Sequence, residues 1–180
     1  MFKTIAHQTL QNKNNIKEVE RNGPYPVKEI ESSFLGAGYY FWDNHLDLAK
    51  WWGERHCNNR YYICECDIEV DEFYFLDLVG NRQDQINLNE LIDRLNISHL
   101  TLGEIMEVLK EIQREQPESQ LFPYKAIRAL DYENKPSFIS RKILFKPNNN
   151  SYAVLSPMYI ICLIEKKELI LSPYKVIYSQ

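Results

Sequence analysis

Residues 35–44 read LGAGYYFWDN, and residues 46–52 read LDLAKWW. The two glycines allow a tight turn and a close approach of the backbone to another group. The aromatic run 39–42 predicts a buried β-strand. Asp43 and Asn44 are good helix N-cap residues, and apolar side chains follow them at helical spacing. We therefore expect a glycine turn, an aromatic strand and a capped helix, in this order.

A second motif, HQT, lies upstream at residues 7–9. Together with GAGYYFWD at residues 36–43 it resembles the ADP-ribosyltransferase superfamily, in its poly(ADP-ribose)-polymerase-like branch. That branch has a first strand ending in His-Gly-Thr/Ser and then Gly-x-Gly-Ile-Tyr-Phe-x-Asp. Ala49 and Trp51 stand where its next helix has an alanine and a stacking aromatic residue. The resemblance covers residues 4–52 and implies an α+β fold whose core is a split antiparallel β-sheet with flanking helices.

The resemblance also implies NAD as the co-substrate and a set of residues around its nicotinamide end. His7 would bond a hydroxyl of the adenine-side ribose, and the backbone of Gln8 would bond the nicotinamide amide. Thr9 would support the histidine loop. Tyr40 would stack on the nicotinamide ring and Trp51 would lie on its other face, since aromatic faces attract a flat cation.

At two positions the assignment of NAD-binding residues has an alternative or departs from the family pattern. Tyr39 is the alternative stacking residue, because neighbouring strand residues point to opposite faces and only one tyrosine can serve. Gln8 replaces the family's glycine, where the nicotinamide amide approaches the backbone. Gly38 completes the residues that the resemblance places at NAD.

Transfer of ADP-ribose breaks the bond between nicotinamide and ribose through a transition state with oxocarbenium character. The family's catalytic glutamate is expected at the start of a late apolar strand, which here reads SPMYIICL at residues 156–163. Depending on register, Met158 or Ile160 takes its position, and neither can bond a ribose hydroxyl or act as a base. The resemblance then implies transfer of a single unit or an inactive protein, and no chain elongation. Three acids near this strand could substitute in space: Asp131, Glu133 and Glu165.

The whole chain of 180 residues suggests a single domain. A net charge of -4 gives no support to a broad phosphate-binding surface. The four cysteines form no CxxC pair, so we expect buried thiols in a reducing compartment and no metal site. No apolar run approaches the roughly 20 residues of a membrane span, so the default location is the cytoplasm.

The remaining elements follow from periodicity. A helical insertion is expected over residues 84–131, with helices at 87–95, 101–115 and 122–130. We also expect a short helix at 14–21 with an asparagine cap. Gly53 and the pair Asn58-Asn59 are expected to close the helix that contains Trp51 and Trp52. Loops are expected at 23–34 and 147–151, and strands at 3–10, 60–68, 70–78, 137–145, 159–164 and 169–178.

The leading hypothesis is a mono-ADP-ribosyltransferase that modifies a protein, RNA or DNA, as a toxin or phage-defence effector with a possible antitoxin partner. The alternative is a catalytically degenerate transferase fold that binds NAD or ADP-ribose. The net negative charge of the chain argues against an NAD-consuming RNA 2′-phosphotransferase, because such an enzyme needs several arginines around phosphates. A purely structural protein is the fourth possibility.

Overall fold

The structure, a computed structural model, describes residues 1–28, 33–131, 141–147, 150–166 and 169–180. Within these residues the chain forms a mixed α+β fold with four α-helices and nine β-strands. The helices are α1 (Ile16–Asn22), α2 (Leu46–His56), α3 (Arg82–Leu95) and α4 (Leu102–Glu115). The strands are β1 (Phe2–Gln11), β2 (Tyr39–Asp43), β3 (Tyr61–Val70), β4 (Phe75–Asp77), β5 (Ala126–Leu130), β6 (Arg141–Leu144), β7 (Tyr152–Leu155), β8 (Tyr159–Leu163) and β9 (Lys175–Ser179).

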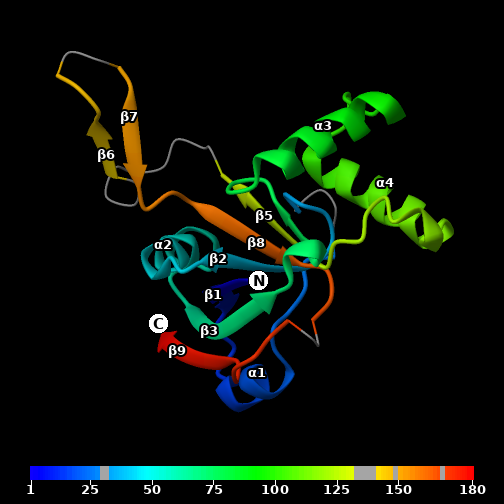
Figure 1. Cartoon of the computed structure of the whole chain (residues 1–180). Helices are drawn as coiled ribbons and strands as arrows, with labels where there is room; N and C mark the ends of the chain where they lie inside the picture. The colour runs from blue at the N-terminus through cyan, green and yellow to red at the C-terminus, as the bar shows by residue number, and fades with distance from the viewer. Residues whose placement is uncertain (29–32, 132–140, 148–149, 167–168) are drawn as a thin grey trace.

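Seven strands make one sheet, in the order β4-β5-β8-β2-β1-β3-β9, and β6 and β7 make a separate two-stranded sheet. In the large sheet only the pair β4 and β5 is parallel; the other pairs are antiparallel. The first two strands of the chain, β1 and β2, therefore lie near the middle of the sheet (Figure 1). Later strands extend the sheet on both sides.

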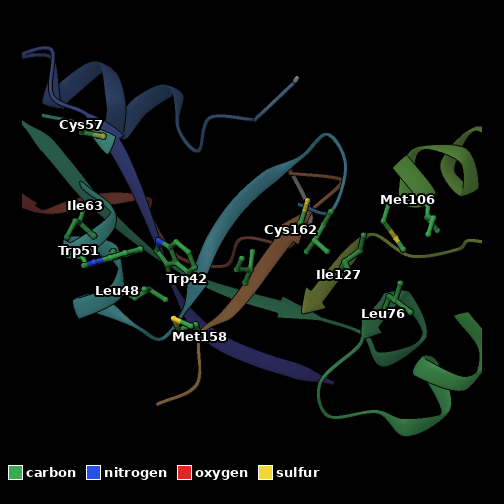
Figure 2. Packing of buried hydrophobic residues seen from close by; sticks show 14 of the residues in the cluster. Trp42, Leu48, Trp51, Cys57, Ile63, Leu76, Met106, Ile127, Met158 and Cys162 are labelled. Carbon is green, nitrogen blue, oxygen red and sulfur yellow. The ribbon is translucent and has the colours of Figure 1, made fainter. Parts of the chain in front are cut away.

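The side chains of the large sheet divide into two buried clusters. One contains residues of α2 and α4, and Figure 2 shows how it packs, with Trp51 of α2, Met106 of α4 and Ile127 of β5 among its members. The other contains Val19 of α1 and Tyr174. Fully burying one large apolar side chain contributes about 1.5–3 kcal/mol, so both faces of the sheet stabilise the fold.

The quoted stretch folds in the expected order, but the cap of α2 differs. His45 is the N-cap, and its Nδ1 accepts a hydrogen bond from the Leu48 backbone N–H at 3.2 Å. Asp43 belongs to β2, where its carboxylate pairs with the Arg128 guanidinium at 2.6 Å. The predicted cap at Asp43 and Asn44 is therefore wrong, because the Asp43 side chain pairs across the sheet.

The helical insertion is shorter than the predicted residues 84–131. α3 and α4 form as expected, and Thr101 caps α4 in a reciprocal capping box. Ala126–Leu130, however, is strand β5 between β4 and β8, which contradicts the predicted helix at 122–130. A short apolar run carries too little periodicity to distinguish a strand from a helix.

Four smaller features differ from the prediction. α2 ends at His56, just before Asn58 and Asn59, but Gly53 lies inside it, where a Cβ would come 2.4 Å from the Tyr61 ring, so glycine lets β3 pack against the helix. Of the predicted strand 169–178, only the later part joins the sheet as β9, and Ile170 makes a single bridge to Ile68. β7 was not expected, and the Asn15 side chain makes no capping bond to α1.

All four cysteines are buried free thiols, as predicted, and Cys64 and Cys66 lie in the same cluster. No helix in the described part of the chain is long and apolar enough to cross a membrane. Glu133 and parts of the predicted segments 23–34, 137–145 and 147–151 lie outside the described residues.

Candidate functional site

The two central strands pair over only a short length. β1 and β2 are in register at two positions, the second of which joins His7 to Trp42. By contrast, β1 pairs with β3 over all ten of its residues, and β2 stays paired with β8 over Tyr39, Tyr40, Phe41 and Trp42. Beyond His7 the sheet therefore opens between β1 and β2.

A cavity of about 210 Å³ lies at this opening. Its walls come from β1, β2, α2, β8 and the loop that precedes β2, and most are apolar or aromatic. The lining residues are His7, Gln8, Thr9, Leu10, Tyr25, Pro26, Val27, Phe34, Tyr40, Phe41, Trp42, Trp52 and Ile160. Four of the residues predicted from two separate motifs thus line one cavity: His7, Gln8, Thr9 and Tyr40.

Gln8 holds the opening together through its buried side chain. Its amide nitrogen donates to the backbone oxygens of Tyr25 (2.9 Å) and Tyr40 (3.2 Å). Its Oε1 accepts from the Tyr25 backbone N–H (3.0 Å) and from the Tyr174 hydroxyl (2.7 Å). The side chain thus links β1 to β2 where their backbones no longer pair.

Gly38 fixes the other side of the opening. It exchanges two backbone hydrogen bonds with Val27, at 2.8 and 3.0 Å, so the loop before β2 is tied to the start of that strand. A Cβ on Gly38 would lie 2.4 Å from the Cys162 Sγ and 2.7 Å from the Leu163 backbone oxygen. Gly38 does not line the cavity; it allows β2 to approach β8.

His7 is buried, and its Nε2 lies 3.0 Å from a carboxylate oxygen of Glu65, its register partner on β3. A carboxylate only accepts, so the neutral imidazole carries its proton on Nε2 and keeps the Nδ1 lone pair. That Nδ1 has no hydrogen-bond partner among the described residues. Burial lowers the pKa of His7 and the Glu65 hydrogen bond offsets part of that effect, which favours the neutral ring.

Tyr40 lines the cavity while its hydroxyl is held by the glycine turn. The hydroxyl donates to the Gly36 backbone oxygen (2.6 Å) and accepts from the Leu35 N–H (2.7 Å). Burial raises the pKa of Tyr40, so the phenol stays neutral. Tyr39 packs on the opposite face of the sheet, so only one of the two tyrosines reaches the cavity.

α4 holds this glycine turn from outside. The Glu107 carboxylate accepts from the Ala37 N–H at 2.6 Å, and the Lys110 ammonium donates to the Ala37 oxygen at 2.9 Å. Gly36 has a φ of 79°, which glycine adopts without strain. The helical insertion therefore positions the turn that carries Tyr40.

Trp52, and not Trp51, lies on the cavity wall. Trp52 packs against Trp42 with ring centroids 5.6 Å apart, and His56 stacks on it at 3.8 Å. Trp51 is buried in the cluster, with the Arg55 guanidinium 5.2 Å from its ring centroid. Successive helical residues point about 100° apart, so Trp52 faces the cavity while Trp51 packs into the core.

Ile160 of β8 lines the cavity, whereas Met158, which precedes β8, is buried outside it. Ile160 pairs with Trp42, which pairs with His7, so the three form one row across β8, β2 and β1. Of the two positions considered for the missing carboxylate, Ile160 is the one that lines the cavity. Neither described acid considered as a substitute, Asp131 or Glu165, lines it.

Glu65 and Trp52 are the site residues that sequence reasoning missed. Trp52 belongs to the quoted stretch, and Glu65 stands in the alternating strand, but strand register is invisible in one sequence. No group of three or more metal-ligating side chains occurs among the residues that the structure describes. No protein-family model, no curated protein and no solved structure matches this chain.

Proposed function

We propose that this chain is an NAD-dependent mono-ADP-ribosyltransferase that modifies a macromolecular acceptor. One observation carries the proposal: His7, Gln8, Thr9 and Tyr40 line a single cavity where β1 and β2 part. These are residues that the resemblance assigns to NAD. A mostly antiparallel sheet that opens between its first two strands accords with the split sheet of that family.

The cavity suits one ring of NAD. About 210 Å³ is smaller than the roughly 300–1,000 Å³ of pockets that enclose a drug-sized ligand, so the rest of the dinucleotide lies outside it. Tyr40, Trp42 and Trp52 supply aromatic walls for the cationic nicotinamide. Nδ1 of His7, an unpaired buried acceptor, is the group that meets a ribose hydroxyl.

In the proposed reaction the bond between nicotinamide and ribose breaks, and the acceptor's nucleophilic atom bonds to the same ribose carbon. Nicotinamide leaves as a neutral molecule, and the acceptor's proton passes to water. The cavity residues contribute by holding the ring and ribose in a reactive geometry. Ile160 offers no carboxylate to accept a proton, so the acceptor itself supplies a reactive group and only one unit is transferred.

A role as a toxin or phage-defence effector, with an antitoxin as partner, belongs to the same proposal. The second candidate function is an NAD- or ADP-ribose-binding module without catalysis. It is favoured by Ile160, an apolar residue in the row that contains His7 and Trp42.

The test incubates the protein with radiolabelled NAD and a cell lysate, then separates protein, RNA and DNA and measures released nicotinamide. The adjacent tyrosines give matched variants: Tyr40→Ala alters the cavity, and Tyr39→Ala alters the opposite face. We expect label in one fraction, lost in His7→Ala and Tyr40→Ala and retained in Tyr39→Ala.

Three results decide between the candidates. NAD binding in a calorimetric titration without nicotinamide release favours the binding module. No NAD binding by the wild-type protein overturns both candidates. Equal affinities for the wild type, His7→Ala and Tyr40→Ala would show that the site is assigned wrongly.

A further inference from the structure

β6 and β7 form a hairpin that stands apart from the seven-stranded sheet (Figure 1). All described residues of 141–147 are exposed. An isolated two-stranded hairpin is at best marginally stable in water, yet this one exposes five large apolar side chains: Ile143, Leu144, Phe145, Tyr152 and Leu155. Such a surface is typical of a binding element.

The charge of the hairpin indicates the kind of partner. Arg141, Lys142 and Lys146 are exposed, and residues 141–155 contain none of the chain's 25 Asp and Glu residues. The chain as a whole has a net charge of -4. A local cluster of cations on an acidic protein is complementary to a polyanion.

Exposed aromatic side chains accompany these cations. Phe145, 68% exposed, directly follows β6 and stands next to Lys146 in the chain. Tyr152 of β7 is 41% exposed, with the Lys142 ammonium 4.7 Å from its ring centroid. Proteins that bind single strands combine cations for the phosphates with aromatic faces on which the bases stack.

The hairpin is also close to the cavity along the chain. β7 ends at Leu155, and Ile160 of β8 lines the cavity. Five residues span at most about 18 Å when fully extended. A strand held by the hairpin therefore lies within reach of the cavity.

We propose that the β6–β7 hairpin binds single-stranded nucleic acid, with phosphates on its three cations and bases on Phe145 and Tyr152. If the bound strand is also the acceptor of ADP-ribose, the acceptor is a nucleic acid; this part of the inference rests on the proposed function. The binding itself needs no NAD.

The experiment measures fluorescence anisotropy of labelled single-stranded RNA and DNA of about 20 nucleotides, and of the matching duplex, without NAD. The test variant is Arg141→Gln/Lys142→Gln/Lys146→Gln. Its control, Lys13→Gln/Lys17→Gln/Arg82→Gln, removes three exposed cations from the body of the protein. A second pair compares Phe145→Ala with Phe73→Ala, an exposed phenylalanine outside the hairpin.

We expect the wild type to bind the single strands more tightly than the duplex. Losing three phosphate contacts lowers single-strand affinity about 100-fold at 0.1 M salt and reduces the salt slope by about 2. Phe145→Ala lowers affinity at least about fivefold. The control triple variant and Phe73→Ala stay within about threefold of the wild type, because screening limits distant charges.

Absence of single-strand binding at about 50 mM salt overturns the inference, as does equal weakening by the two triple variants. A wild-type dimer that Phe145→Asp dissociates, without oligonucleotide binding, would show that a second copy covers the hairpin. Oligonucleotide binding without nicotinamide release leaves the inference standing and counts against the transferase. Label on protein together with no oligonucleotide binding overturns the inference and supports the transferase.

Discussion

Replacing Gln8 with glutamate tests how the opening between β1 and β2 is held. The amide nitrogen of Gln8 donates to the backbone oxygens of Tyr25 and Tyr40, at 2.9 and 3.2 Å. Its Oε1 accepts from the Tyr25 N–H and the Tyr174 hydroxyl. The side chain is only 5% exposed. In Gln8→Glu a carboxylate oxygen faces two carbonyl oxygens where the amide now donates.

The magnitude follows from these contacts. A buried polar group left unsatisfied costs about 1–3 kcal/mol, and the substitution affects two carbonyl oxygens, so we expect a loss of about 2–6 kcal/mol at pH 8. Burial and the facing oxygens disfavour the charged form and raise the pKa of the new carboxyl above its value in the unfolded chain. The folded protein then binds the carboxyl proton more tightly than the unfolded chain does. The stabilisation from this proton is complete below the pKa of the unfolded chain and is lost as pH rises through the pKa of the folded protein, so the stability deficit grows from pH 5 to pH 8. Its slope is at most about 1.4 kcal/mol per pH unit.

Urea unfolding at pH 5 and pH 8, followed by tryptophan fluorescence, measures this deficit against the wild type at each pH. Gln8→Leu is the first control and should lose about the same stability at pH 5 as at pH 8, because leucine does not titrate. Gln11→Glu is the second: Gln11 also donates to a backbone oxygen, that of Arg60 at 3.0 Å, but is exposed. A Gln8→Glu deficit that is the same at both pH values, or no larger than that of Gln11→Glu, would refute the reasoning.

Two further predictions concern the same sheet. Gly38→Ala should cost about 1–3 kcal/mol in urea unfolding, because its Cβ would lie 2.4 Å from the Cys162 Sγ and 2.7 Å from a backbone oxygen of β8. Gly80→Ala, whose closest neighbour is a movable side chain, is the control, and equal costs would contradict the clash. Burial raises the pKa of Cys64 to about 11 and those of Cys66 and Cys162 to about 12, so these thiols should resist a thiol reagent at pH 8. Reaction of all four cysteines within minutes in the folded protein, as fast as in urea, would show that this burial is wrong.

The amino-acid sequence alone predicts the local elements around the site. Glycines followed by an aromatic run indicate a turn and a buried strand, and Thr101 begins an amphipathic helix with its own cap. The opposite orientations of Tyr39 and Tyr40 follow from strand alternation. These features depend on residues a few positions apart, so one sequence contains the necessary information.

Only the tertiary structure decides which distant residues meet. It places Trp52 at the cavity, Glu65 beside His7, and Ile160 in the row with Trp42. It also inserts Ala126–Leu130 into the sheet as β5. A shift of one residue in strand register moves every side chain to the other face, and that register is set by packing between strands far apart in the chain. Local periodicity therefore predicted the strand and the helix that flank the cavity, whereas the opening itself depends on how β1 pairs with β2 and β3.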